Sequence, residues 1–495
     1  MAITAIRLQN FMAFGEDTDA EWIELKPITL LFGRNSSGKS AIIRALRLLK
    51  QSLTDAPADS PFAYKTEDGV DVGFFNTMLH QKARDEREKE EQEKAGQEKL
   101  ILRFEFRMTV SPSSLMRLLS LEKIEEKDAQ VEIAFGFGWN ERQGHAELVL
   151  LVIDAPSTLV GEKRRTIFCA DRLEYEKARQ DPNAWWFCSD FLPLPGKTYR
   201  EADQWPAVLI DLQSGFLPML DLTPEARRQA GSWGDEVTSV RGIVNDFRTE
   251  LAELLNHIEY TRPMRPEPKR FYMLDDAQQR HWERQGLRAF LKLIKKELNE
   301  AQLKELGIWL EKLELGIYID PNVLFDISER GVVSELYLDE GSKGVRRVSY
   351  ADIGFGASQV VPVVIQSLLA EENSLVIIEQ PELHLHPSAQ AVLADLFIKK
   401  SNDGVRFLIE THSEHLILRL QRRIRKQVIP PSDLFVIYVT RRGGESRCHS
   451  LQLDEEGDFI DDWPEGFFED GFKEMFDLEV LHESSTIEKD EKPSE

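Results

Sequence analysis

The sequence predicts an α/β protein, because strand-like and helical patterns alternate at both ends of the chain. Near the N-terminus an apolar run, ITLLF, leads through a glycine-rich loop into the helical run AIIRALRLLKQSL. In the C-terminal half three strand-like runs, SLVIIEQ, VRFLIETH and DLFVIYVT, are separated by helical stretches. This alternation is typical of βαβ units around a parallel sheet.

The loop after the first apolar run carries the clearest chemistry. Residues 33–40 read GRNSSGKS, which matches G-x-x-x-x-G-K-[ST] in the strand–loop–helix setting that the motif requires. Its backbone amides and the following helix N-terminus favour phosphate, Lys39 would reach the β- and γ-phosphates, and Ser40 would ligate Mg²⁺. The sequence therefore predicts ATP and Mg²⁺ binding by Gly33, Arg34, Asn35, Ser36, Ser37, Gly38, Lys39, Ser40 and Ala41.

The pattern along the chain divides it into four regions. Residues 1–153 are expected to form an N-terminal lobe with antiparallel strands near 101–110, 130–137 and 146–153. Residues 154–320 are expected to form a mostly helical insertion, and residues 321–440 a C-terminal lobe with the alternating strands and helices. Residues 441–495 form an acidic extension.

Composition sets limits on partners and location. The 495 residues carry a net charge of −24, of which 17 acidic residues and three lysines after Leu453 contribute −14. The protein as a whole is therefore not expected to be drawn to nucleic acid. No apolar run approaches the ~20 residues of a membrane span and no leader pattern is visible, so a cytoplasmic location is expected. Three widely spaced cysteines indicate reduced thiols and no metal site.

Two basic segments leave alternatives open. The helix after His412 contains Arg419, Arg422, Arg423, Arg425 and Lys426, which indicates a solvated face more than a nucleic-acid or partner contact. A proline-rich segment contains Arg262, Arg265 and Arg270. These arginines could contact phosphates or a partner, but ion pairs within the fold explain them equally well.

Three further motifs follow in the order that one superfamily shows, and the chain resembles an ABC-type ATPase head of the RecF, SMC and OLD kind. In the strand ending IIEQPE, the resemblance makes Glu379 the acid that holds Mg²⁺. The next residue is usually a glutamate that activates water, and here it is Gln380, which can position water but cannot accept its proton. Glu382 is a candidate substitute base. A glutamine introduced to trap ATP is an alternative reading.

The remaining motifs complete the site that the resemblance implies. His412, at the end of the strand FLIETH, matches the switch histidine that senses the γ-phosphate and the attacking water. Residues 354–359, GFGASQ, match loosely the signature loop that caps the γ-phosphate of the opposite subunit, through Gly356, Ser358 and Gln359. A purely structural glycine-rich turn is the alternative. Asn76 and Gln81 are candidates for a glutamine loop, and that role stays unassigned.

The nearest resemblance is to bacterial predicted ATPases with a C-terminal region of unassigned function. These share the GFGxSQ signature, the IEQPExHLHP strand and a terminal WPEGFF element, over residues 1–80 and 345–475. Such proteins resemble ATPase subunits of anti-phage defence and DNA-maintenance loci. His384 and His386 in the LHLHP loop are expected to contact a dimer partner, because no third metal ligand is visible. The implied fold is a mixed sheet with an antiparallel lobe and a helical lobe.

The resemblance also implies a mode of action. Two subunits would close around ATP, and hydrolysis would let the dimer or higher homo-oligomer open, controlling a separate effector protein from a neighbouring gene. The alternatives are an ATP-locked switch that scarcely hydrolyses, and a RecF-like clamp with DNA as its partner. A fused nuclease is disfavoured because only about 56 residues follow Val439.

Overall fold

The structure is a computed structural model, and it describes most of the chain. The described residues are 2–16, 22–57, 59–66, 69–82, 101–110, 129–140, 144–155, 165–171, 186–188, 208–211, 219–222, 234–270, 272–273, 287–295, 297–318, 325–327, 333–340 and 347–464, with isolated positions between them. The predicted charged segment 82–99 and the end of the acidic extension lie almost wholly outside this set.

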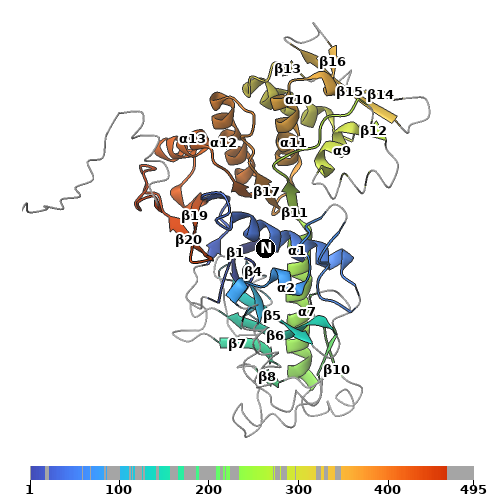
Figure 1. Ribbon diagram of the computed structural model, residues 1–495, viewed down its shortest axis with the longest axis vertical. Coiled ribbons are helices and arrows are strands. Elements are labelled where there is room, and N and C mark those ends of the chain that lie inside the picture. The colour runs from blue at the N-terminus through green and yellow to red at the C-terminus, as the bar shows by residue number, and fades with distance from the viewer. Residues whose placement is uncertain are drawn as a thin grey trace, which may run out of the picture.

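A mainly parallel sheet forms the middle layer of the molecule (Figure 1). Its six strands lie in the order β11 (Ile258–Thr261), β17 (Leu375–Glu379), β18 (Arg406–Glu410), β3 (Ile28–Phe32), β19 (Leu434–Arg442) and β20 (Glu445–Leu451). The first five are parallel, and β20 pairs antiparallel at the edge. The parallel sheet was predicted, but β11 was not: the sequence places residues 259–261 at the start of the proline-rich segment.

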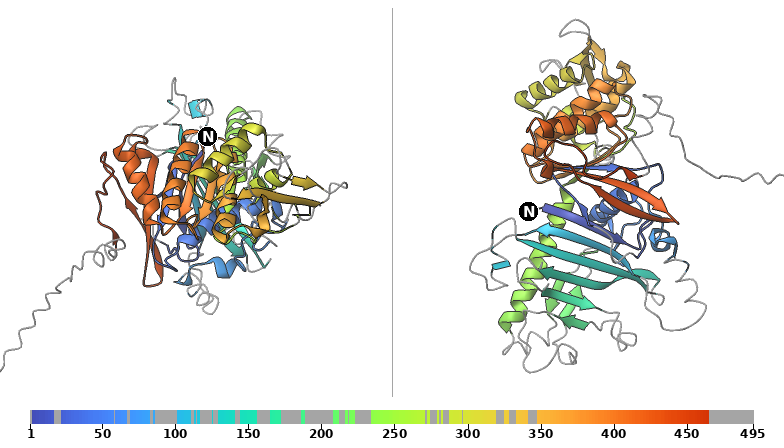
Figure 2. Two further views of the ribbon diagram at one scale, coloured as in Figure 1. Left: turned by 90° about the horizontal axis from the view of Figure 1, so that it is seen from above. Right: turned by 90° about the vertical axis from the view of Figure 1, so that its left-hand side faces the viewer.

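An antiparallel sheet packs below this layer (Figure 2, right). Its order is β2 (Ile23–Glu24), β1 (Ala2–Gln9), β4 (Leu102–Thr109), β5 (Gln130–Asn140), β6 (His145–Ala155), β7 (Arg165–Asp171) and β8 (Trp186–Cys188). The predicted meander of three strands is confirmed as β4, β5 and β6. The proposed boundary at residue 153 falls inside β6, and β7 and β8 continue the same sheet beyond it.

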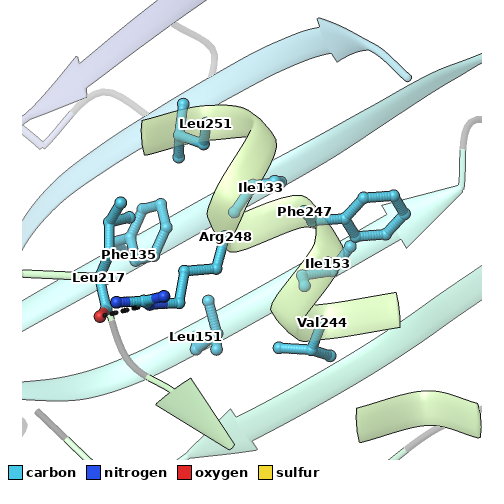
Figure 3. A pocket seen from close by; sticks show the side chains of 9 residues that line it. All are labelled: Ile133, Phe135, Leu151, Ile153, Leu217, Val244, Phe247, Arg248 and Leu251. Carbon is cyan, nitrogen blue, oxygen red and sulfur yellow. Dashed lines mark hydrogen bonds between the residues drawn. The ribbon is translucent and has the colours of Figure 1, made fainter. Parts of the chain in front are cut away.

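The long helix α7 (Gly234–Asn256) covers one face of the antiparallel sheet. Val244, Phe247 and Leu251 of α7 lie against side chains of β5 and β6, and the apolar cavity left between them is only about 10 Å³ (Figure 3). At its rim Arg248 donates a hydrogen bond from Nε to the Leu217 carbonyl, 3.3 Å away. A gap of this size holds about one water, so this contact is packing and not a ligand site.

Helices form the opposite lobe, shown at the top of Figure 1. They are α9 (Arg288–Ile294), α10 (Glu300–Lys312), α11 (Phe355–Leu369), α12 (Pro387–Asn402) and α13 (Glu414–Arg425). Short strands lie beside them: β12 (Tyr272–Met273), β13 (Ile317–Tyr318), β14 (Phe325–Ile327), β15 (Val333–Glu340) and β16 (Arg347–Ser349). A two-stranded pair, β9 (Val208–Asp211) and β10 (Met219–Leu222), lies near α7. The middle third therefore contributes strands as well as the predicted helices.

Alternation of side chains along the parallel strands explains why two lobes flank one sheet. Leu31, Ile377 and Leu408 belong to a buried cluster with α1 (Lys39–Asp55), α2 (Phe75–Met78) and the antiparallel sheet. Leu30, Ile378 and Ile409, one residue before or after them, belong to a second cluster with α9–α13. Because successive side chains point to opposite faces, strands that are apolar throughout must be covered on both sides. The predicted architecture, a mixed sheet with an antiparallel lobe and a helical lobe, is confirmed.

The C-terminal extension is part of the fold as far as it is described. Beyond β20, Trp463 packs edge-on against Phe32 at 5.5 Å and Tyr438 at 6.1 Å between ring centroids. Trp463, the first residue of the WPEGFF element, therefore lies at the parallel sheet, next to the strand that leads into the phosphate loop. Within the described residues no helix combines the length and apolar character needed to cross a membrane.

The basic helix α13 is largely paired within the fold. Asp395 on α12 accepts hydrogen bonds from both Arg419 and Arg423, with the shortest N–O distance to each at 2.7 Å. Arg425 pairs with Asp458 at 2.7 Å. Arg422, Arg425 and Lys426 are the exposed cations of this set. The arrangement favours the solvated face that the sequence indicated, with three of its five charges balanced by acids.

Asp395→Asn is expected to lower the free energy of unfolding by about 1–3 kcal/mol at pH 7, because two arginines lose a charged acceptor. Burial alone would raise the pKa of Asp395, but the bonds from Arg423 and Arg419 lower it below the ordinary value. This stabilisation is therefore fully present above a pH of about 4 and is lost as the pH falls through the lowered folded pKa. Urea unfolding of the wild type and the variant, at pH 7 and at a pH below the lowered folded pKa, measures this difference in the free energy of unfolding. Asp403→Asn, at an exposed carboxylate, is the control.

Candidate nucleotide site

Three parallel strands end side by side at one edge of the central sheet. β3 runs into the phosphate loop (residues 33–40), β17 ends at Glu379 and β18 ends at Glu410. In the register of the sheet Glu379 lies opposite Glu410, and Glu410 lies opposite Leu31. Ligands of open α/β sheets bind outside the carboxyl ends of the strands, so the topology assembles the predicted motifs at one place.

Glycines let the phosphate loop pass close to its neighbours. Gly33 and Gly38 have φ values of 142° and 113°, in a region that side chains other than glycine rarely adopt. A Cβ at Gly33 would lie 2.4 Å from the Val439 carbonyl oxygen, and one at Gly38 would lie 2.4 Å from Ser446 Oγ. Both contacts come from β19 and β20, so the last strands of the sheet shape the back of the loop. The exposed face of the loop is formed by Arg34, Asn35 and Ser36.

Lys39 lies inside the loop and has oxygen partners on both sides. Its Nζ donates to the carbonyls of Gly33 at 2.7 Å and Arg34 at 3.0 Å, and it lies 3.9 Å from Glu410 Oε1. Burial lowers the pKa of Lys39, and the charge of Glu410 opposes that shift. Only 4 % of the side chain is exposed. These oxygens hold the ammonium group where a phosphate could replace them as its partners.

Glu410 is a site residue that the sequence analysis missed. Its Oε2 accepts a hydrogen bond from Ser40 Oγ at 3.3 Å, which puts a buried carboxylate beside the predicted metal-ligating hydroxyl. Burial raises the pKa of Glu410, the nearby charge of Glu379 adds to the shift, and Lys39 opposes it. The available signal was an acid directly before Thr411 and His412 at the end of a buried strand.

The described residues suit ATP and Mg²⁺ chemically. The Ser37 hydroxyl is buried and has no hydrogen-bond partner in the described part of the chain. Buried polar groups are normally paired, so a bound phosphate would supply the partner that this hydroxyl lacks. The hydroxyl of Ser40 and the carboxylates of Glu379 and Glu410 are the oxygen ligands that Mg²⁺ prefers. Ala41 is buried in the first turn of α1 and contributes through its backbone position only.

A tyrosine from the unpredicted strand β11 orients the acid of β17. Tyr260 donates from its hydroxyl to Glu379 Oε1 at 2.7 Å, and the Arg47 guanidinium of α1 lies 3.7 Å from the tyrosine ring centroid. Burial raises the pKa of Tyr260 far above its usual range, so the hydroxyl stays a donor. Residues 258–261 therefore belong to the site because of their pairing with β17.

Gln380 stands in a left-handed backbone conformation, with φ at 47°. Its backbone N donates to the Glu410 carbonyl at 2.7 Å, and its own carbonyl accepts from Arg265 at 3.2 Å. Non-glycine residues in this region cost energy and persist where neighbouring contacts hold them. The residue at the position of the usual catalytic glutamate is thus fixed by contacts on both of its main-chain groups.

Glu382 holds the strand end that carries His412. Its Oε2 accepts from Thr411 Oγ1 at 2.8 Å and its Oε1 accepts from the His412 backbone N at 2.7 Å. Burial raises the pKa of Glu382, while these bonds act against the shift. Because each carboxylate oxygen already accepts a hydrogen bond, Glu382 serves to hold Thr411 and His412 in position. Its use as a base stays a prediction. Burial lowers the pKa of His412, and the charge of Lys39 lowers it further.

The signature segment (residues 354–359) enters helix α11, as predicted, with Gly354 as its N-cap. A Cβ at Gly356 would lie 2.5 Å from the His384 carbonyl oxygen, so this glycine allows close packing on the LHLHP loop. Ser358 and Gln359 are 1 % and 3 % exposed, and Ser358 Oγ donates to the Phe355 carbonyl. The exposed part of the segment is Phe355, whose ring lies edge-on to His384 at 4.7 Å. Contact of Ser358 and Gln359 with a partner's nucleotide stays a prediction.

The other candidates lie outside this cluster. His386 caps α12 by accepting from the Ser388 backbone N. Asn76 and Gln81 are exposed, and the role of the glutamine loop stays unassigned. Arg262 is exposed, Arg270 pairs with Asp352, and Arg265 is buried against β17.

Comparison with known families agrees with this geometry. Residues 1–179 and 252–417 match a family described as AAA ATPase domain, which is more than half of the chain. The chain belongs to the AAA ATPase domain family. Residues 429–478 match a second family, described as a protein of unknown function (DUF3696). No curated protein matches the sequence. The boundaries of the first match leave residues 180–251 outside the shared ATPase domain, which include most of α7.

Solved structures similar to this member of the AAA ATPase domain family include SMC heads. One is an Smc head bound to the C-winged helix domain of ScpA, with a TM-score of 0.41, 11% identity, and coverage of 92% of this chain and 99% of that chain. Another is the SMC head domain from Thermotoga maritima, with a TM-score of 0.37, 12% identity, and coverage of 92% and 100%. The likeness is distant.

Proposed function

We propose that this ATPase-domain protein hydrolyses ATP between two copies of itself and acts as a nucleotide-gated switch. The observation that carries the proposal is the cluster at the sheet edge, where Lys39, Ser40, Glu379 and Glu410 converge from three neighbouring strands. A phosphate-binding loop alone would support binding. Two carboxylates beside its lysine and serine support phosphoryl-transfer chemistry as well.

The proposed chemistry follows from what each side chain can do. Lys39 exchanges its carbonyl partners for the β- and γ-phosphates. Ser40 and Glu379, with Glu410 beside them, would hold Mg²⁺, which would supply positive charge next to the phosphate oxygens. The Gln380 amide orients the attacking water, and the neutral imidazole of His412 hydrogen-bonds near the γ-phosphate. Because Gln380 cannot take a proton from water, we expect slow turnover.

Dimerisation around ATP is supported by what the single chain leaves exposed. Phe355, between two glycines at the start of α11, is 47 % exposed, and its ring contacts only the edge of His384 in the LHLHP loop among the aromatic contacts described. The helix N-terminus behind it favours an anion, as a partner's γ-phosphate would be. Closing a second copy over the nucleotide would cover this aromatic and complete the site.

The experiment is light scattering after gel filtration, with Mg²⁺ and a non-hydrolysable ATP analogue. We expect the mass to double with the nucleotide and to stay monomeric with Lys39→Ala. Phe355→Ser should weaken the dimer, whereas Leu418→Ser, at another exposed apolar residue on α13, should not. A wild-type mass that ignores the nucleotide would contradict the proposed dimer.

The biological role proposed is that of a sensor or motor subunit that controls a separate effector in anti-phage defence or DNA maintenance. Its support is the sequence resemblance of the signature, the IEQPE strand and the WPEGFF element. DNA is the less favoured partner, since Asp395 and Asp458 balance three arginines of α13. ATP-dependent DNA binding with a steep salt dependence would favour the clamp instead.

A further inference from the structure

We propose that Arg265 is a positioning residue that couples the two ATP sites of the dimer, by tying the signature helix α11 to the catalytic segment of the same subunit. The inference rests on the proposed function, because it assigns a regulatory path within that site. The structural basis is a chain of contacts from Gln359 through Arg265 to Glu379 and Gln380.

The first half of this path is a two-point clamp. Gln359, on the second turn of α11, accepts a hydrogen bond from the Arg265 backbone N at 2.9 Å and donates from Nε2 to the Arg265 carbonyl at 3.2 Å. Both residues are 3 % exposed. An amide side chain bonded to both main-chain groups of one residue leaves that residue little freedom to move independently of the helix.

The second half is the guanidinium fork of Arg265. Its Nη2 donates to the Glu379 carbonyl at 3.0 Å, and its Nη1 donates to the Gln380 carbonyl at 3.2 Å. The fork therefore bonds the last residue of β17 and the residue after it, Gln380, whose φ is 47°. A lysine could reach these carbonyls only from one ammonium nitrogen, whereas arginine bonds them with two separate donors held in a planar fork.

The energetics indicate that the arrangement is retained for more than packing. A buried guanidinium is costly, and here it has main-chain oxygens as its partners, while its Nε has no partner among the described residues. An apolar side chain of similar volume would avoid that cost. What the arginine adds is a direct mechanical link between α11 and the water-orienting Gln380.

The consequence is communication between the two sites. The N-terminus of α11 faces the nucleotide of the partner subunit in the proposed dimer, so its position depends on whether that nucleotide is present. Through Gln359 and Arg265 the same displacement reaches Gln380 of its own subunit, which acts on its own nucleotide. One site is thus fully active only when the other is filled. Coupling between two binding sites typically changes affinity by about 5–150-fold, and here we expect the coupling to appear in turnover.

The test is ATP turnover by Gln359→Leu, which keeps the side-chain volume and removes both clamp bonds. We expect kcat to fall about tenfold while nucleotide affinity stays within about twofold, since the phosphate loop is untouched. Gln359→Glu keeps the bond accepted from Arg265 N and loses the donated one, so its kcat should lie between those of wild type and Gln359→Leu. If Gln359→Leu does not fold, the comparison of Gln359→Glu with wild type tests the proposal instead. Arg270→Ala, in the same segment but exposed, is the matched control.

Mixed dimers separate coupling from a merely structural role. An excess of Lys39→Ala subunits should lower wild-type turnover per competent site about fivefold or more, because the partner's site is empty. The same excess should change the residual turnover of Gln359→Leu less than twofold. A Gln359→Leu protein with wild-type kcat and wild-type sensitivity to the inactive partner would overturn the coupling alone. A wild-type chain without turnover would overturn the proposed function and the coupling with it.

Discussion

Glu379→Gln is expected to lower ATP turnover by about 10²–10³-fold. The substitution removes a charge that lies at the end of β17 and faces the phosphate loop through Glu410, and losing one preorganised electrostatic contact to a reacting centre has effects of this size. The fold should be unaffected, because Tyr260 can donate equally well to the amide oxygen of glutamine. Steady-state phosphate release measures the effect, and thermal melting checks the fold.

Glu371→Gln is the matched control for that variant. Glu371 lies just before the opposite end of β17 and its side chain is 65 % exposed, so it has the same chemistry without access to the site. We expect its turnover to equal that of wild type. If Glu379→Gln retained more than about half of the wild-type rate, the cluster at the sheet edge would not be the catalytic centre.

Gln380→Glu is expected to raise turnover by about 10–100-fold. A carboxylate at this position can accept the proton of the attacking water, and general-base catalysis is typically worth 10²–10⁴-fold. We expect an increase at or below the lower limit of that range, because Glu379, Glu382 and Glu410 already place negative charge at the strand ends. The substitution should leave the backbone in place, because the contacts that hold Gln380 are made by its main-chain N and carbonyl and not by its side-chain amide.

The comparison is made by single-turnover hydrolysis with enzyme in excess over ATP. Gln380→Asn, which shortens the side chain without adding a base, should not gain activity and serves as the control. No increase for Gln380→Glu, with normal ATP binding, would mean that another group already removes the proton. Glu382 would then be the residue to examine, despite the donors on both of its oxygens.

Much of the fold followed from local pattern. The phosphate loop, the buried strands at 375–379 and 406–410 and the meander of β4, β5 and β6 are each contained in a short run of sequence, and each was predicted. β11 was not, because a four-residue strand after a long helix has no periodicity of its own and is defined by pairing with β17, more than a hundred residues away. β20 was not predicted either, although it pairs with the preceding strand β19 across the turn at Gly443 and Gly444, because these residues were assigned to the acidic extension.

The site shows the same division between local and distant information. Lys39, Ser40, Glu379 and His412 belong to motifs, so the sequence names them. Tyr260 and Arg265 act through contacts with β17 and α11 that no local spacing encodes. Glu410 belongs to the FLIETH motif, but the sequence assigned a role only to His412, two residues later. Ser358 and Gln359 were predicted to face a partner, and burial in their own subunit could be known only from the packing of α11.

The central claim is that this chain hydrolyses ATP at the edge where β3, β17 and β18 end. The most direct measurement is steady-state ATP hydrolysis by the purified wild-type chain with Mg²⁺, against Lys39→Ala as background. The account predicts slow turnover that stands clearly above that background and disappears when Mg²⁺ is removed. Turnover equal to the Lys39→Ala background, with ATP still bound by the wild type, would contradict it and leave a nucleotide-locked switch.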